Sequence, residues 1–140
     1  MGNCIAQDRA DSGFAAKEVS KTMSDPAECD LLAVKRLGRY LTTFPMSLHL
    51  YRWQDGPKSI DCYSDSDWGG DLVTRRSTSG GCIFRGSHMV LHGSRTQQIV
   101  SLSSAEAELH ALVKCASDGA SCSQHDGRIL RRIRFADLYR

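Results

Sequence analysis

The chain has 140 residues, with 18 lysines and arginines against 16 aspartates and glutamates, and 41% of its residues are hydrophobic. This length and composition are typical of a globular protein and argue against intrinsic disorder. No apolar run approaches the roughly 18 residues of a transmembrane helix, and Asp8 interrupts the N-terminus before the apolar region of a secretory signal can form. The sequence therefore predicts an intracellular protein, cytoplasmic or nuclear, that is neither secreted nor bound to a membrane.

Six cysteines stand at positions 4, 29, 62, 82, 115 and 122, and no two of them have Cys-x-x-Cys spacing. In a reducing compartment such residues are free thiols or small buried hydrophobic side chains. We therefore expect neither a disulfide framework nor a zinc site.

The first helix signal lies between Asp25 and Glu28, after an N-terminal stretch without a clear period. Asp25 suits the N-cap, Pro26 the first helical position, and Glu28 the position three beyond the cap. The pattern predicts a helix over residues 26–42 that ends before Pro45. Four apolar residues recur at helical spacing in this segment: Leu31, Val34, Leu37 and Leu41.

A run of turn formers, residues 54–58, separates this helix from a segment with a different hydrophobic period. Residues 60–65 alternate between apolar and polar side chains, which predicts a strand that ends in carboxylates. Residues 67–79 are rich in glycine, serine and threonine and predict a loop. Residues 81–84 and 89–92 then predict the two strands of a hairpin.

A second helix is predicted over residues 104–116. Residues 103–106 read Ser-Ser-Ala-Glu, a capping box at its start. Beyond Ser117 the chain is first rich in serine and glycine and then rich in arginine, and the pattern assigns it no element. We expect the apolar stripe of the helix to face the sheet; it consists of Ala105, Leu109, Leu112, Val113 and Ala116.

Carboxylates stand both at the end of the first strand and on the second helix, where they are candidates for binding divalent metal ions. A pair of hard cations that hydrolyses a phosphodiester takes carboxylate oxygens as ligands. On the helix, Glu106 and Glu108 both flank the apolar stripe, so periodicity alone does not choose between them. Glu106 also has a capping role as an alternative. Ordinary solvated charge remains the alternative for the remaining acids.

Three blocks of sequence follow one another in a characteristic order and spacing: YSDSDWGG at 63–70, TRRSTSGG at 74–81 and VSLSSAEAELHAL at 100–112. Together they resemble the ribonuclease H domain of copia-type (Pseudoviridae-like) retrotransposon Pol polyproteins. The upstream stretch 14–41, with AVKRLGRYL at 33–41, is similar to the end of the reverse transcriptase region that precedes this domain.

The resemblance implies a division of the chain into three parts. Residues 1–53 are expected to be a remnant of the reverse transcriptase connection region, residues 58–116 a ribonuclease H-like core, and residues 117–140 an unassigned basic tail. The implied fold is α/β, a truncated ribonuclease H-like fold with a three-stranded antiparallel sheet, a packed helix and an N-terminal helix.

The resemblance also implies roles for individual residues. Asp65 matches the first metal-binding aspartate of the family and Glu108 the helix glutamate, so both are expected to be catalytic and to hold Mg²⁺ or Mn²⁺ in a two-metal site. Arg75, Arg76 and Thr78 are candidates for contacts with nucleic-acid phosphates. The alternative for these three is a turn held by serine and threonine side chains.

The chain departs from the family pattern at two places. His92 stands where the family usually has a tryptophan, and the fourth strand that carries the next metal-binding aspartate has no clear match. Asp137 is the candidate for that ligand, but residues 133–136 before it are compatible with either a strand or a basic amphipathic helix. The fourth acid has no candidate, so we expect an incomplete active site.

Two functions follow from these expectations. The first is metal-dependent hydrolysis of RNA in RNA–DNA hybrids by a segment of a retrotransposon polyprotein. The alternative is a catalytically inactive retroelement relic that at most binds nucleic acid. The expected partners are the hybrid and the reverse transcriptase region of the parent polyprotein, with no membrane and no small-molecule cofactor.

Overall fold

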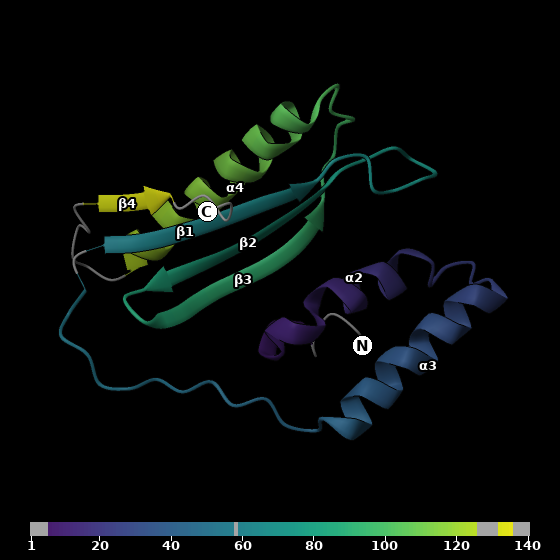
Figure 1. Ribbon diagram of the computed structural model, residues 1–140, viewed down its shortest axis with the longest axis horizontal. Coiled ribbons are helices and arrows are strands. Elements are labelled where there is room, and N and C mark those ends of the chain that lie inside the picture. The colour runs from purple at the N-terminus through teal and green to yellow at the C-terminus, as the bar shows by residue number, and fades with distance from the viewer. Residues whose placement is uncertain (1–5, 58, 126–131, 136–140) are drawn as a thin grey trace. The chain divides into compact units, whose positions relative to one another are not determined.

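The computed structural model describes residues 6–57, 59–125 and 132–135, and the chain divides into two compact units (Figure 1). The first unit, Met1–Leu50, contains helices, and the second, Tyr51–Arg140, contains the sheet. Among the described residues, no helix combines the length and the apolar character that a membrane crossing requires.

The first unit is built from a short 3-10 helix, Ala10–Ser12, and two longer helices, α2 (Gly13–Lys21) and α3 (Glu28–Thr43). The predicted N-terminal helix is therefore present as α3, but it begins two residues later than Pro26. Its cap also differs, because the Ala27 N–H donates to the carboxylate of Asp30 at 2.9 Å. Helix α2 was not predicted from the sequence.

Arg9 connects the start of the first unit with the end of α3. Its guanidinium donates to Asp11 Oδ2 at 2.7 Å and to the carbonyl oxygen of Phe44 at 2.8 Å. The Tyr40 hydroxyl also donates to Asp11, at 2.6 Å. Because both Arg9 and Tyr40 bond the Asp11 carboxylate, they hold its pKa well below the usual range.

The second unit contains a four-stranded sheet with the strand order β3-β2-β1-β4. Strands β1 (Ser59–Asp67), β2 (Thr78–Arg85) and β3 (His88–Thr96) are antiparallel neighbours, which confirms the predicted three-stranded sheet. Strand β4 (Arg132–Phe135) adds a parallel partner to β1. The alternative of a basic amphipathic helix, considered for residues 133–136, is therefore wrong for residues 133–135, which the structure describes as strand.

The tip of the β2–β3 hairpin is held by a side chain that precedes the sheet. Gln54 Nε2 donates to the carbonyl oxygen of Arg85 at 2.9 Å, and Gln54 Oε1 accepts the Ser87 N–H at 2.9 Å. Gly86 turns the chain with φ +63°, and a Cβ there would collide with the Gln54 amide. The segment before β1 is thus fixed to the hairpin tip.

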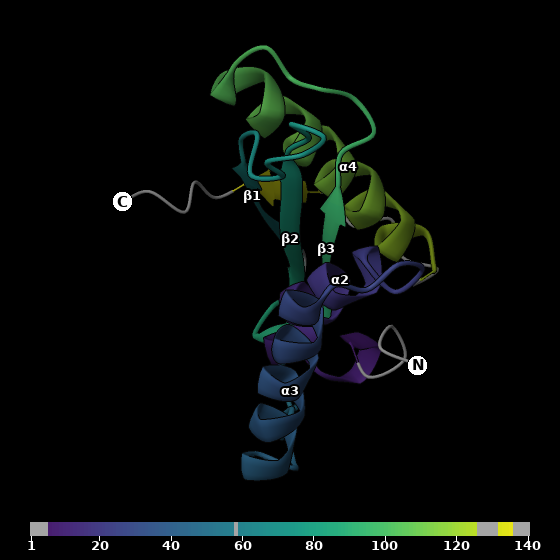
Figure 2. The same cartoon turned by 90° about the vertical axis from the view of Figure 1, so that its right-hand side faces the viewer.

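Helix α4 (Ser104–His125) packs on β1 and β2 and runs nine residues beyond the predicted end at 116. Figure 2 shows it along one face of the strands. The predicted inner stripe was wrong, since Leu109 and Val113 are exposed. The reason is steric, because small side chains let the helix approach Ile60 and Ile83 closely. The residues that α4 buries are Ala107, Ala111, Cys115 and Gly119.

The core of the second unit contains unreactive thiols. Cys62 and Cys115 are buried together with Ile60 and Ile83. Burial, with Cys115 nearby, raises the pKa of Cys62 to about 12, and burial also raises the pKa of Cys115. The five described cysteines are all free: Cys29, Cys62, Cys82, Cys115 and Cys122.

A pair of glycine substitutions tests the close packing of α4. A Cβ at Gly119 would lie 2.6 Å from Cys62 Sγ, whereas a Cβ at Gly38 in α3 has open space around it. We expect Gly119→Ala to lower the free energy of unfolding by about 1–3 kcal/mol through overpacking. Gly38→Ala, the matched control, should leave it unchanged or raise it by roughly 0.5–1 kcal/mol. Urea unfolding followed by circular dichroism measures both, and equal effects would contradict the packing described.

Candidate nucleic-acid and metal site

Asp65 lies near the end of β1, where its side chain is exposed. The buried residues Ile60 and Cys62 face α4, and the strand pairs with β2 without a break from Ile60 to Asp67. Because side chains alternate along a strand, Asp65 lies on the other face of β1, together with Asp61 and Tyr63.

Glu108 reaches β1 from α4. Its Oε1 accepts the backbone N–H of Ser66 at 3.2 Å, one residue beyond Asp65. Strand β4 pairs with β1 only from Ser59 to Cys62 among the described residues. The Ser66 N–H therefore lies beyond β4, where no described strand pairs with that edge of β1. Glu108 thus contacts the backbone of β1 one residue beyond Asp65, whereas the Asp65 side chain lies on the face of β1 that does not pack on α4.

Glu106, two residues earlier, has a different position. Its Oε2 accepts the Leu102 N–H at 2.7 Å, and its own N–H donates to Ser103 Oγ at 3.2 Å. These are the two halves of an N-terminal cap of α4. Periodicity did not distinguish the two glutamates, but their hydrogen bonds do. Glu106 caps α4, whereas Glu108 bonds the backbone of β1.

Gln97 fixes the start of α4 against the sheet, and the sequence analysis did not single it out. Its Nε2 donates to Ser79 Oγ at 2.9 Å and to the Ala107 carbonyl oxygen at 2.8 Å, and its Oε1 accepts the Ser101 hydroxyl at 3.1 Å. Both Gln97 and Ser101 are buried. The sequence gives only a weak signal for this role, because Gln97 is one polar residue in the segment between a strand and a helix.

The donor set fits a hard cation in kind, because carboxylate oxygens are the ligands that Mg²⁺ prefers. Within residues 6–57, 59–125 and 132–135, however, no three His, Cys, Asp or Glu side chains gather closely enough to hold a metal ion. Asp137, the predicted third ligand, lies outside the described residues. The strand that precedes it, β4, pairs Phe135 with Cys62.

The loop after β1 carries the predicted phosphate contacts. Its turn is fixed by Asp71, whose Oδ1 accepts the N–H groups of Val73 and Thr74 at 3.1 and 2.9 Å. Arg75 and Arg76 are exposed on this loop, and Arg75 has a φ of +58°. Thr78 is only 7% exposed, so a phosphate contact by its hydroxyl would require its cover to move.

The aromatic residue of the first block is half exposed and hydrogen bonded. Trp68 Nε1 donates to the carbonyl oxygen of Ser101 at 3.0 Å, which ties the start of this loop to the segment before α4. The Ser77 hydroxyl, which is fully buried, accepts the Gly69 N–H at 3.1 Å at the other end of the loop. The first two sequence blocks are therefore joined to each other and to the third.

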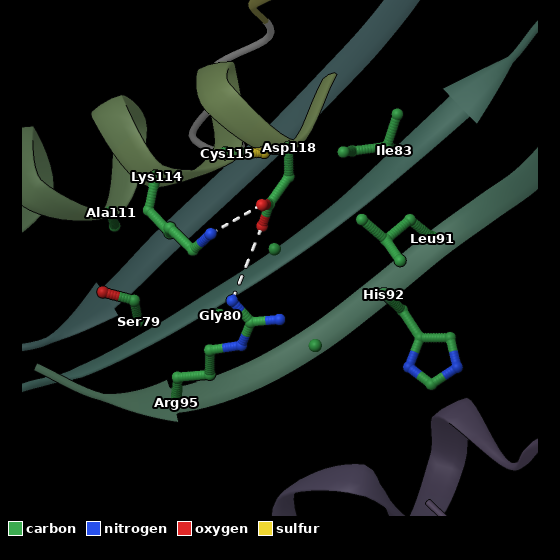
Figure 3. Close-up of a pocket in the computed structure, with 12 residues that line it drawn as sticks. Ser79, Gly80, Ile83, Leu91, His92, Arg95, Ala111, Lys114, Cys115 and Asp118 are labelled. Carbon is green, nitrogen blue, oxygen red and sulfur yellow. Dashed lines mark hydrogen bonds and ion pairs between the residues drawn. The ribbon is translucent and has the colours of Figure 1, made fainter. Parts of the chain in front are cut away.

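A separate cavity lies between α4 and β3 (Figure 3). Asp118 binds Lys114 at 2.6 Å and approaches Arg95 at 3.9 Å across its mouth. His92, which stands where the family usually has a tryptophan, is one of the residues that line this cavity (Figure 3).

The chain is similar to several known proteins. An uncharacterized mitochondrial protein of Arabidopsis thaliana is 35% identical over 112 residues, 79% of this chain and 45% of that protein. The retrovirus-related Pol polyprotein from transposon RE1 of the same plant is 33% identical over 114 residues, 81% of this chain. Secreted RxLR effector protein 161 of Plasmopara viticola is 37% identical over 111 residues, 77% of that protein.

The chain spans less than half of the first of these relatives and only 8% of the RE1 Pol polyprotein. No protein-family profile and no solved structure matches it.

The different positions of the two helix glutamates predict different effects on stability. Glu106→Ala removes half of the α4 cap and should lower the free energy of unfolding by about 1 kcal/mol. Glu108→Gln keeps an oxygen that accepts the Ser66 N–H and should change the stability by less than about 0.5 kcal/mol. Thermal and urea unfolding of both variants measure this difference, and a larger loss in Glu108→Gln would contradict the assignment of the cap.

Proposed function

The chain belongs to a retrotransposon Pol-related family that includes the Pol polyprotein of transposon RE1, and we propose that its second unit acts as a ribonuclease H-like segment. Its proposed reaction is metal-dependent hydrolysis of RNA in RNA–DNA hybrids. Residues 1–53 are proposed to derive from the reverse transcriptase region that precedes this segment in the parent polyprotein. The proposed place of action is the cytoplasm or nucleus.

The observation that carries this proposal is the hydrogen bond from the Ser66 N–H to Glu108. It brings the helix acid to the strand position next to Asp65, although the two acids are far apart in sequence. A parallel fourth strand beside β1 supports the proposal as well, because it leads toward the same end of β1. Neither feature is required for a loop that only binds phosphate.

Asp65 and Glu108 are the residues proposed to hold Mg²⁺ or Mn²⁺. Glu108 has one oxygen engaged by Ser66 and a second oxygen left for a ligand role, and Asp65 is exposed to solvent. Bound metal ions of this kind activate a water molecule and stabilise the leaving oxygen of a phosphodiester. Arg75 and Arg76 are proposed to attract the phosphate backbone and to orient the duplex over the acids.

A hybrid duplex is the proposed substrate class because the RNA strand offers 2′-hydroxyl groups in a wide, shallow minor groove. The exposed arginines Arg75 and Arg76 suit the phosphates that border such a groove. The sugar hydroxyls then distinguish the strand to be cut from the DNA strand.

A second candidate function is an inactive relic that binds nucleic acid without cutting it. The specific observation that favours it is the ligand count, since no three His, Cys, Asp or Glu side chains of the described residues gather closely enough to hold a metal ion. Mg²⁺ gives up its water reluctantly unless the site is nearly ideal. Binding through arginines does not depend on this geometry.

Cleavage of a labelled RNA–DNA hybrid in millimolar Mg²⁺ or Mn²⁺ tests the first candidate. We expect weak cleavage that Asp65→Asn and Glu108→Gln each reduce by more than the roughly 10–100-fold typical of losing an outer-shell partner. Asp55→Asn, which removes an exposed acid of the same unit, should leave the rate unchanged. If Asp137→Asn also abolishes cleavage, it supports Asp137 as the third ligand. Cleavage that survives Asp65→Asn would rule out the proposed site.

Binding of the same hybrid in EDTA tests the phosphate contacts without any metal. We expect the logarithm of the binding constant to fall linearly with the logarithm of salt concentration, and the Arg75→Gln, Arg76→Gln pair to reduce the steepness of that slope by about 2. The matched control is the exposed pair Arg36→Gln, Arg39→Gln on α3, which should leave the slope unchanged. Binding without cleavage under all metal conditions would favour the relic.

A further inference from the structure

The loop between β1 and β2 presents two aliphatic side chains to solvent at its tip. Leu72 is 83% exposed and Val73 is 92% exposed, and in Figure 1 the loop extends beyond the arrowhead of β1. Single exposed apolar residues are ordinary on protein surfaces. Two adjacent ones at the end of an ordered loop present a small apolar surface that is held in place.

This tip is held in one conformation by hydrogen bonds on both of its sides. The Asp71 carboxylate caps Val73 and Thr74, the Arg75 N–H donates to the Asp71 carbonyl oxygen at 2.7 Å, and the Asp71 N–H donates to the Arg76 carbonyl oxygen at 3.2 Å. Because the backbone is already ordered, little conformational entropy remains to be lost when the tip contacts a partner.

Positive charge stands next to the apolar tip. Arg76 is exposed, and the Arg75 guanidinium lies over Gly69, where a Cβ would be 3.4 Å from it. The tip itself, residues 72–74, carries no charge. Asp71 borders the tip on its other side, where its carboxylate accepts the N–H groups of Val73 and Thr74. A surface with an apolar centre and arginines along one border is complementary to a nucleic-acid groove, in which sugar faces lie next to phosphates.

We infer that Leu72 and Val73 contact the sugars of the minor groove of an RNA–DNA hybrid, while Arg76 contacts a phosphate at its rim. This inference rests on the proposed function, and it adds a contact that selects the shape of the duplex. The minor groove of an A-form duplex is wide and shallow and admits a two-residue tip. That of B-DNA is only about 6 Å wide, so the tip would have to deform the duplex in order to enter it.

The tip is proposed as a nucleic-acid contact and not as a protein-docking site because of its charge and position. It follows directly from the strand that carries Asp65, and the exposed Arg76 beside it can bind a phosphate. A protein partner is retained as an outcome of the test.

The test measures hybrid and DNA-duplex binding by the full chain in EDTA. The double variant Leu72→Ser, Val73→Ser should weaken hybrid binding by ~10-fold, since it removes apolar contact area, and should weaken DNA-duplex binding much less. Its salt slope should stay that of the wild type, because no phosphate contact is lost. Arg76→Gln should instead lower the slope by about 1.

Leu48→Ser is the matched control, because Leu48 is 93% exposed in the first unit and has no part in the inference. It should leave hybrid affinity unchanged, and unfolding curves should show that all variants fold. Hybrid binding that the tip variant does not change would overturn the inference but not the proposed function. Absence of hybrid binding by the wild type would overturn both. A tip variant that changes only the oligomeric state would assign the tip to a protein contact.

Discussion

The close approach of α4 to the sheet is the constraint on which the candidate site depends. The helix buries Ala107 and Ala111 against β1 and β2, and Gly119 leaves no room for a side chain beside Cys62. Small side chains bring the helix axis close to the strands, and dispersion contacts fall off steeply with even a small gap. With Ala107 at the interface, the adjacent Glu108 is at the right height to reach the Ser66 N–H. A bulkier helix face would lift this carboxylate away from β1.

Two glutamines connect separate segments of the second unit through their side-chain amides. Gln97 bonds β2 and α4, and Gln54 bonds Arg85 and Ser87 at the tip of the β2–β3 hairpin. A primary amide both donates and accepts, so one side chain satisfies several backbone and hydroxyl groups at once. Partners of opposite kind, such as the Arg85 carbonyl oxygen and the Ser87 N–H, also fix which end of the Gln54 amide is oxygen.

The organisation of the loop after β1 connects the acids with the proposed substrate contacts. Trp68 and Ser77 anchor its two ends, and Asp71 caps its turn. Serine, threonine and aspartate side chains that bond nearby backbone groups are the usual way in which such loops are ordered. A loop ordered in this manner holds Arg75 and Arg76 exposed next to the strand that carries Asp65. Asp65 and the arginines proposed to contact phosphates therefore lie on one continuous segment, whereas Glu108 comes from α4.

Local features of this protein were determined by the sequence itself. The alternation of residues 60–65, the turn at Gly86 and the cap at Ser103 and Glu106 each appear in the structure, because strand period, left-handed turns and helix caps depend on a few neighbouring residues. Which face of α4 is buried, which glutamate reaches β1 and how β4 joins the sheet were decided only by the tertiary structure. Hydrophobicity favoured the face with Leu109 and Val113, but shape complementarity to the sheet selected the face with the smallest side chains. That choice depends on residues distant in sequence, which no local pattern records.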